Sequence, residues 1–447
     1  MRIATLTTPL TLIAASALAM ACADSSTVTS PTASHVAGAR GAGSEGNVPR
    51  YEIRDLQGDL AAAGFVAGFN AFDIDNSGRV AGSALLPSGV QHGFMWERGQ
   101  ATDVGSFGGP ALNSQAAGRT GRDELSILSE IAAVDPLNED FCGLFSSRMC
   151  RAGVWRNGVI AMLPTLGGNS AAALTTNIRG QIVGVAEDGV VDNTCMLPQK
   201  SHFHAAVWER GQIQKLPPLP GDQVSIGLRI NDHGQAVGTS GLCSNTRYGG
   251  FGIGPHAVLW DNGVPRYLGN LGDPSNGVAA SINNQGEVVG GAGYPDGTLH
   301  PFLWTEATGM RDLGLLSADP NDSWNTPFQI NDRGEMVGAS CRPDFSVCRG
   351  YLWRNGAFTD LNDLVPADSP LYIILPLAIN QVGEIAGLAV VKSTGEPHIF
   401  LARPASGAAN SSLVDAGRAT SASTRRVMLD QATREVVRRR LGHASTR

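Results

Sequence analysis

The sequence lacks the short motifs that mark the commonest catalytic sites. It has no GxSxG nucleophile turn, no HExxH zinc motif, no phosphate-binding GxxxxGK[ST] loop and no pair of CxxC motifs. It also lacks a long hydrophobic run, because the apolar stretch from Leu6 to Leu18 is too short to cross a bilayer as a permanent helix. These absences argue against the motif-bearing enzymes, and we predict no catalytic residue, no metal ligand and no cofactor.

The body of the chain has few basic residues. The formal net charge is −7, but residues 405–447 hold eight Arg against three acids, so residues 22–404 carry about −13. An acidic body repels phosphate backbones, which predicts that nucleic acid is not a partner. Gly is abundant instead, at 56 of 447 residues, and this composition favours turns and short strands over long helices.

The N-terminal segment has the features of an export signal. In residues 1–21, Arg2 precedes the apolar stretch, which is typical of a signal peptide. The sequence LAMAC at 18–22 resembles a bacterial lipobox, so Cys22 is a candidate lipidation site that would anchor the protein to the cell envelope. The same Ala-Met-Ala also suits ordinary signal peptidase, which leaves plain secretion open. Residues 22–49 are rich in Ser, Thr, Ala and Gly and predict a flexible linker.

From Tyr51 onward, three strings recur in fixed order about every 50 residues. The first is an apolar run that ends in Trp in six of its seven copies: HGFMW (92–96), RAGVW (151–155), HAAVW (204–208), HAVLW (256–260), HPFLW (300–304), RGYLW (349–353) and HIFLA (398–402). The second ends in Leu or Val, as in ATDV (101–104) and MRDL (310–313), and a lone copy, IRDL, stands at 53–56.

The third string is a hairpin with Asn three residues before Gly, a turn signal that we attribute to two residues tolerating positive φ. Copies end in Gly at 82, 184, 238, 290, 338 and 387, and LNSQAAG at 112–118 is a degenerate copy. Each unit therefore has four short strands, and a 50-residue unit cannot bury a core alone. The body, residues 50–404, is predicted to be an all-β, seven-bladed β-propeller of four-stranded blades. Its opening strand, 51–56, should close the ring by pairing with its last, 398–402.

These strings resemble the bacterial extracellular HAF repeat family, named for the His-Ala-Phe segment that HAVLW, HAAVW and HPFLW echo. The resemblance covers residues 51–402, although RAGVW and RGYLW depart from the His-first pattern. It implies an exported protein of unestablished biochemical role and supplies no catalytic residues.

Residues that recur at one position in several units are better explained by structure than by chemistry, because a catalytic group is needed only once. Five His occupy one repeat position, and we expect each to form a hydrogen bond inside its own blade: His92, His204, His256, His300 and His398. The six repeat Trp should be core residues. The basic tail, 405–447, could form an amphipathic helix over 424–441, but a solvated, frayed extension is the preferred interpretation.

If Cys22 is acylated, six of the seven Cys remain to pair. All six lie between the strand that leaves the Asn turn and the Trp strand. Cys142 and Cys150 share one connection, as do Cys341 and Cys348, so each pair should close its own loop. Cys195 and Cys243 lie one repeat apart and should link neighbouring blades. Free buried thiols are the alternative.

The long connections, 119–150, 185–203, 239–255 and 314–327, should share one face. Because loops on a rigid scaffold usually carry binding, we place the ligand site there, with five candidate contacts: Arg247, Tyr248, Tyr294, Asp322 and Trp324. The predicted function is a monomeric, non-enzymatic surface module for a protein, peptide or glycan. Two alternatives stay open. The first is a hydrolase or lyase with acids on the loops, which converging carboxylates would favour; the second is a purely structural envelope protein.

Overall fold

The computed structural model describes residues 49–119, 124–144, 146–249, 252–316, 322–406 and 426–440. The chain divides into two compact units, Met1–Asn47 and Val48–Arg447, and the described residues belong to the second. The predicted signal peptide, the Cys22 lipidation site and nearly all of the linker therefore lie outside the described residues. None of the helices in the described part is long and apolar enough to cross a membrane.

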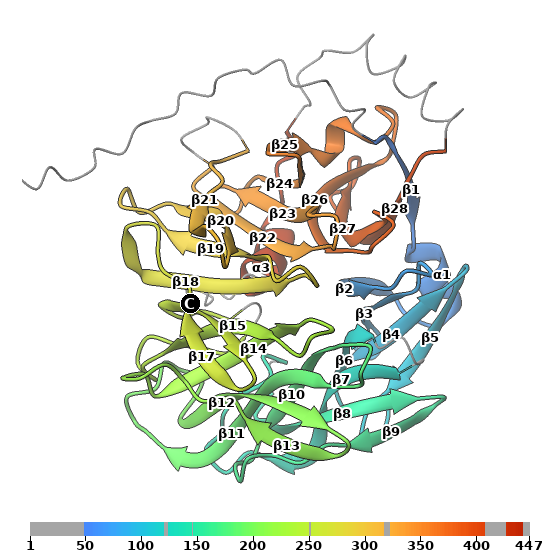
Figure 1. The fold of residues 1–447 in the computed structure, drawn as a ribbon. Helices are drawn as coiled ribbons and strands as arrows, with labels where there is room; N and C mark the ends of the chain where they lie inside the picture. The colour runs from blue at the N-terminus through green and yellow to red at the C-terminus, as the bar shows by residue number, and fades with distance from the viewer. Residues whose placement is uncertain are drawn as a thin grey trace, which may run out of the picture. The chain divides into compact units, whose positions relative to one another are not determined.

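The described body is all-β, as expected, and its strands form successive antiparallel meanders (Figure 1). Five sheets have four strands each, and an eight-stranded sheet consists of β18–β25, joined through the single parallel pair Leu299–Trp324. The strands of the first four-stranded meanders are β2 (Ala67–Ile74), β3 (Val80–Leu85), β4 (Gln91–Glu97), β5 (Gln100–Gly105), β6 (Ser114–Arg119), β7 (Glu124–Val134), β8 (Arg148–Arg156), β9 (Val159–Met162), β10 (Ala171–Thr176), β11 (Ile182–Val191), β12 (Ser201–Glu209), β13 (Gln212–Lys215), β14 (Val224–Ile230), β15 (Ala236–Gly241), β16 (His256–Asp261) and β17 (Val264–Tyr267).

The remaining strands complete the pattern. The eight-stranded sheet and the sheet that holds both ends of the body contain β18 (Asp273–Ile282), β19 (Val288–Gly293), β20 (Leu299–Thr305), β21 (Gly309–Asp312), β22 (Trp324–Ile330), β23 (Met336–Cys341), β24 (Cys348–Arg354), β25 (Ala357–Asp360), β26 (Leu371–Ile379), β27 (Ile385–Val391), β28 (Pro397–Pro404) and β1 (Tyr51–Asp55). The described residues also form three short helices: α1 (Gln57–Ala62), η1 (Leu361–Asp363) and α3 (Gln431–Arg440).

The first and last strands of the body pair with each other, as the repeat phase predicted. β1 runs antiparallel to β28, with Tyr51 opposite Pro404 and Asp55 opposite Phe400. The sheet order is β1-β28-β27-β26, so the lone N-terminal strand supplies the fourth strand of the C-terminal sheet. β2 in turn contacts β26, β27 and β28, as β6 contacts β3 and β4.

The Asn of each hairpin turn acts through its side chain, which corrects the predicted reason for its presence. Asn283 accepts hydrogen bonds from the amides of Gln285 (3.1 Å) and Glu287 (2.9 Å) through Oδ1, while Nδ2 donates to the carbonyl of Asn331 in the next meander (3.1 Å). Only the Gly of this turn, Gly286, has a positive φ, at 77°. The Asn side chain therefore links its own turn to the neighbouring turn by hydrogen bonds. A positive φ at this residue, the reason predicted from the sequence, would not provide such a link.

The same bond recurs from meander to meander. The side-chain amide of the turn Asn donates to the next turn in five places: Asn177 to Asn231, Asn231 to Asn283, Asn283 to Asn331, Asn331 to Asn380, and Asn380 to Asp75. The last of these bonds links the C-terminal sheet to the first hairpin of the body, 305 residues away in sequence.

One hairpin was predicted in the wrong place. Residues 112–118 do not form a turn, because Ser114–Arg119 is strand β6, paired with β7. The connection between these strands falls at 120–123, outside the described residues. The meander β6-β7-β8-β9 is consequently complete rather than eroded.

The repeat Trp residues are core residues, as predicted, with one exception. Trp96, Trp155, Trp208, Trp260 and Trp304 are at most 7% exposed, whereas Trp353 is half-buried. The indole N–H of Trp208 donates to the Pro164 carbonyl at 2.8 Å, and that of Trp260 donates to the Pro217 carbonyl at 2.7 Å. Each of these Trp therefore fills the space between sheets and satisfies its one polar atom.

The described part of the tail folds back onto the body, so the frayed extension is wrong for residues 426–440. Helix α3 and the segment before it bury Leu429 and Val437 in a cluster with Phe328 and Phe345. The amide of Leu429 donates to the Ser346 carbonyl at 2.9 Å. The apolar side of the predicted amphipathic helix is thus covered by the loop between β23 and β24. Residues 407–425 and 441–447 lie outside the described residues.

Candidate functional site

The six Cys form the three disulfides that their repeat positions predicted. Cys142 is bonded to Cys150, Cys341 to Cys348, and Cys195 to Cys243, at sequence separations of 8, 7 and 48. The first two bonds close single connections, and the third joins the β11–β12 connection to the β15–β16 connection.

The long connections of three successive meanders pack against one another. The amide of Met196 donates to the Cys243 carbonyl at 2.8 Å, and Lys200 Nζ donates to the Leu137 carbonyl at 2.6 Å. Phe141 and Tyr248 pack ring to ring with centroids 5.0 Å apart. The described parts of the connections at 135–144, 192–200 and 242–249 therefore pack together, which agrees with the predicted loop face for three of its four connections.

A cleft of about 410 Å³ opens among the neighbouring connections of this side. Two aromatic side chains, Trp324 and Phe345, contribute to its lining, and their rings lie 6.1 Å apart edge to face. The rest of the lining mixes aliphatic side chains with hydroxyl, amide and carboxylate groups. The described lining residues are Gly252, Ile253, Asp273, Ser275, Asn276, Val278, Ala280, Gly291, Gly293, Gly297, Thr298, Leu299, Ser323, Trp324, Thr326, Pro343 and Phe345.

The cleft has a single ionisable side chain among its described lining residues, the carboxylate of Asp273. Hydrogen bonds from the hydroxyl and amide of Ser275 lower the pKa of Asp273, so it is ionised near neutral pH. General acid–base catalysis needs a second group that exchanges protons near the operating pH. The arrangement can accept hydrogen bonds and pack against an apolar surface, but it offers no acid–base pair.

The structure brings together only part of the predicted contact set. Trp324 lines the cleft, and the half-buried ring of Tyr294 stacks on His300 with centroids 4.3 Å apart. Arg247 forms an isolated bridge with Ile253, so its backbone belongs to the β15–β16 connection.

Two of the predicted contacts are corrected. Tyr248 is 4% exposed and packs on Phe141, and Asp322 is 1% exposed and forms an ion pair with Arg349. Both side chains hold loops together and leave no surface for a ligand. Tyr248 and Asp322 were predicted as contacts because aromatic and charged residues are common in binding sites, but here both are buried within loops.

Each of the five repeat-position His forms a hydrogen bond to an Asp, which lies on a strand of the same sheet or, for His256, in the connection before β14. His92 contacts Asp103, and His300 contacts Asp312, each on the adjacent strand, at 2.9 and 3.0 Å. The other pairs are His204 with Asp188 at 2.7 Å, His256 with Asp222 at 2.8 Å, and His398 with Asp55 at 2.7 Å. The recurrence of the pair supports a structural role for these His.

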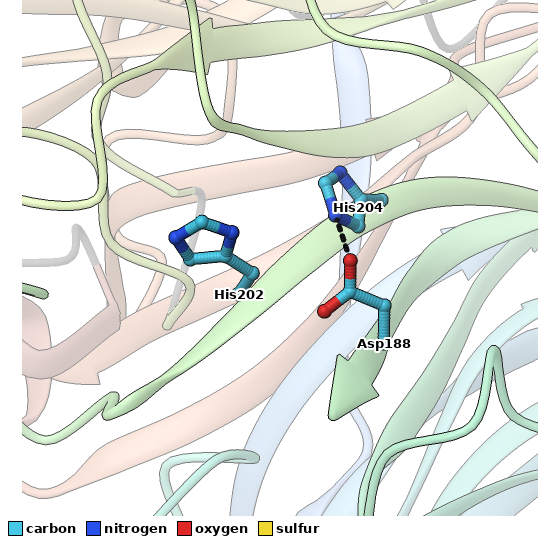
Figure 2. A group of neighbouring side chains, drawn as sticks. All are labelled: Asp188, His202 and His204. Carbon is cyan, nitrogen blue, oxygen red and sulfur yellow. Dashed lines mark hydrogen bonds and ion pairs between the residues drawn. The ribbon is translucent and has the colours of Figure 1, made fainter. Parts of the chain in front are cut away.

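One of these His belongs to a group with metal-ligand chemistry. Asp188, His202 and His204 have ligand atoms within 4.8 Å of one another, and Figure 2 shows both His rings on β12 above the Asp188 carboxylate. Each His is already engaged, since His202 Nε2 contacts Asp192 at 3.0 Å and His204 Nε2 contacts Asp188. Burial lowers the pKa of His204 to about 4, so this ring is neutral. The group follows the His–Asp pattern of the other sheets and needs no metal to explain it.

A second group is not explained by the repeat. The carboxylates of Asp135, Glu139 and Glu187 have oxygen atoms within 4.8 Å of one another, and all three residues are at most 3% exposed. Burial and the charge and hydrogen bonding of Glu139 raise the pKa of Glu187 to about 9. Hard oxygen donors of this kind are the ligands that Ca²⁺ and Mg²⁺ prefer.

No family model matches this chain. No curated protein matches it either. Among solved structures, it is similar to a puromycin-hydrolyzing peptidase of Mycobacterium tuberculosis (TM-score 0.40, 11% identity, 79% of this chain and 56% of the peptidase) and to the Aleuria aurantia lectin (0.33, 9%, 67% and 96%). It is also similar to the Trypanosoma rangeli sialidase (0.37, 10%, 80% and 55%). The chain spans little more than half the length of the peptidase and of the sialidase. Similarity at this level assigns no activity.

Sequence reasoning missed both groups of clustered side chains. The group of Asp188, His202 and His204 could have been suspected from the sequence His-Phe-His at 202–204, because alternate residues of a strand point to the same side. The acidic group had no such signal. Asp135 and Glu139 belong to a connection whose path is set by tertiary contacts, and Glu187 belongs to the next sheet. Most of the cleft lining was missed for the same reason.

Proposed function

We propose that this chain is an exported repeat protein of the HAF type, folded as a closed seven-bladed β-propeller, and that it binds ligands without acting on them. The blade count is supported by seven groups of four strands, if the eight-stranded sheet is divided at its single parallel pair. Closure is supported by the β1–β28 pairing and by the hydrogen bond from Asn380 to Asp75. The ring abolishes unpaired sheet edges between first and last blades.

The cleft on the loop side is the observation that carries the binding function. It combines two aromatic side chains with hydroxyl, amide and carboxylate groups and has no cationic side chain among its described lining residues. Such a lining suits a neutral ligand with many hydroxyls and one apolar face, because Trp324 packs on C–H groups while Asp273, Ser275 and Asn276 accept and donate hydrogen bonds. A short glycan has this chemistry, and a peptide is the second ligand class.

The hydrolase or lyase alternative needs carboxylates that converge where a substrate can reach them. Three carboxylates do converge, at Asp135, Glu139 and Glu187, but all three are at most 3% exposed. Among the described lining residues of the open cleft, Asp273 is the only acid. A binding role therefore agrees better with the position of the acids than a hydrolytic one.

The proposal includes the cellular location of the protein. Three disulfides persist in oxidising compartments, which suits an exported chain. Acylation of Cys22 would hold the body at the cell envelope through the linker of residues 22–49, and unacylated chains would be secreted. We propose a monomer that binds its ligand through the cleft, with no nucleic acid among its partners.

The test is a glycan and peptide array probed with the full chain, followed by affinity measurements on the strongest ligand. We expect W324A and D273N each to weaken binding by about tenfold or more, since buried aromatic contacts and charged hydrogen bonds dominate binding energies. Y267A is the matched control, because Tyr267 is an aromatic residue, 38% exposed, that does not line the cleft.

The melting temperature of each variant must be recorded, because Trp324 also packs near Phe328. Unchanged affinity in both cleft variants would place the site elsewhere on the molecule. Release of shortened products from the bound glycan, detected by mass spectrometry, would favour the hydrolase alternative.

A further inference from the structure

The buried acidic group joins two neighbouring meanders. Asp135 and Glu139 lie in the connection between β7 and β8, which the Cys142–Cys150 disulfide also closes. Glu187 lies on β11 of the next sheet. Glu139 accepts hydrogen bonds from the amides of Lys200 and Ser201, so its carboxylate is fixed at the start of β12. The three carboxylates therefore meet where one long loop packs on the adjacent sheet.

Two of the carboxylate oxygens accept no hydrogen bond from an N–H or hydroxyl group in the described structure. Glu187 Oε1 and Asp135 Oδ2 are buried atoms without a hydrogen-bond partner. An unsatisfied buried oxygen is costly, and an unsatisfied buried charge is more so. Arg151 is the nearby cation, but its Nη1 is also buried without a partner, and burial lowers the pKa of Arg151. The site thus presents free oxygens that no described donor satisfies.

The preceding sheet provides an internal comparison. Glu130 and Glu187 are repeat-equivalent, because the amide of Glu130 donates to the Asn113 carbonyl and that of Glu187 to the Ser170 carbonyl, at 2.9 and 3.0 Å. In return, the Glu130 carboxylate accepts a hydrogen bond from the Asn113 amide at 3.0 Å, and the Glu187 carboxylate accepts one from the Ser170 amide at 2.8 Å. The second oxygen of Glu130 accepts from the hydroxyl of Ser146, whereas the second oxygen of Glu187 faces two more acids. The repeat therefore explains a buried Glu here but not the acids around it.

We infer that Asp135, Glu139 and Glu187 form a binding site for one Ca²⁺ ion, which would hold the β7–β8 connection against the neighbouring sheet. Three carboxylates supply hard oxygen ligands and a formal charge that a divalent ion offsets. Mg²⁺ retains several waters in near-octahedral geometry, and ligands that are at most 3% exposed leave little access for them. Ca²⁺ tolerates irregular geometry. The inference does not depend on the proposed ligand function of the cleft.

Stripping and titration of the full chain test this inference. The protein is dialysed against EDTA and then titrated with Ca²⁺, with binding followed by calorimetry and the melting temperature followed in parallel. We expect about one Ca²⁺ per chain and a rise in the melting temperature with Ca²⁺ concentration, because a ligand that binds only the folded state stabilises it. E187Q and D135N should each abolish the Ca²⁺-dependent rise.

E130Q is the matched control, since it alters the equivalent buried Glu of the preceding sheet and should keep the Ca²⁺-dependent rise. In EDTA, E187Q should melt at or above the wild-type temperature, because its side-chain amide can donate a hydrogen bond to the neighbouring carboxylates; a purely structural Glu would give the opposite result. Absence of Ca²⁺ binding to the wild type would overturn the inference and would indicate a proton shared by Glu139 and Glu187. Retention of the rise in both E187Q and D135N would overturn it as well, as would equal stabilisation by Mg²⁺.

Discussion

At the scale of single residues, the His–Asp pairs show how a repeat preserves an interaction while its members change. In three sheets the Asp comes from the string that follows the Trp strand, at Asp55, Asp103 and Asp312. In one sheet Lys215 occupies the position of this Asp, and His204 forms its hydrogen bond with Asp188 of the preceding strand. The interaction is kept because a buried imidazole without a partner would be destabilising.

The pair of His398 and Asp55 should make stability depend on pH, because it joins β28 to β1. The hydrogen bond that His398 donates to the Asp55 carboxylate raises the pKa of His398. Burial opposes the ionisation of Asp55, but the hydrogen bonds that it accepts from His398 and Gln57 outweigh burial and lower the pKa of Asp55. The His398 contribution is full below about pH 6.5 and is lost as pH rises through its raised pKa. That of Asp55 is lost only as pH falls through its lowered pKa.

We therefore expect H398Q to lower the melting temperature more at pH 5.5 than at pH 8.5. H204Q is the matched comparison with the opposite sign, because the pKa of His204 is lowered to about 4 and its contribution is lost as pH falls below about 6.5. Equal effects of H398Q at both pH values would show that His398 is not charged in the folded protein.

At the scale of elements, the strands and disulfides were predictable from the sequence because the repeat averages over many copies. Seven Trp-type strings fixed the strand order, and loop position alone selected one Cys pairing of fifteen. The hairpin predicted at 112–118 was wrong because this string lacks the central Gly by which the other copies are aligned. Composition alone does not distinguish a turn from a strand. The docking of α3 was missed because its apolar side chains have a partner only in the folded body.

The disulfides should differ in what they contribute. The chain-entropy model gives about 4 kcal/mol for the 48-residue separation of Cys195 and Cys243, and about 2.5 kcal/mol for the 8-residue separation of Cys142 and Cys150. We expect the double Ser variant of the first pair to lose more free energy of unfolding in urea than that of the second. Peptide mapping of the unreduced protein provides the control, and recovery of Cys195 linked to Cys142 would contradict the assignment.

At the scale of the whole molecule, the sequence predicted the order of the sheets and how the two ends meet, but not which side chains meet between sheets. The β1–β28 ladder joins segments more than 300 residues apart, and their positions in the repeat predicted this pairing. The Asn380–Asp75 bond, which spans a similar distance in sequence, was not predicted. The acidic group of Asp135, Glu139 and Glu187 depends on loop paths that no repeat constrains. The candidate sites therefore lie where the repeat pattern ends.

Ring closure can be tested by removing the N-terminal strand while keeping every other sheet. Deletion of residues 48–58 removes β1, exposes one edge of β28 and takes away Tyr51 and Leu56, which are 2% and 0% exposed. Each fully buried side chain of this size contributes about 1.5–3 kcal/mol, and the lost strand pairing adds to that. We expect the melting temperature to fall by about 5 °C or more. Deletion of residues 1–47, the separate N-terminal unit, is the matched control and should leave the melting temperature unchanged. If both truncated chains melt at the temperature of the full chain, pairing of β1 with β28 does not close a ring, and the body is held together by contacts between neighbouring sheets alone.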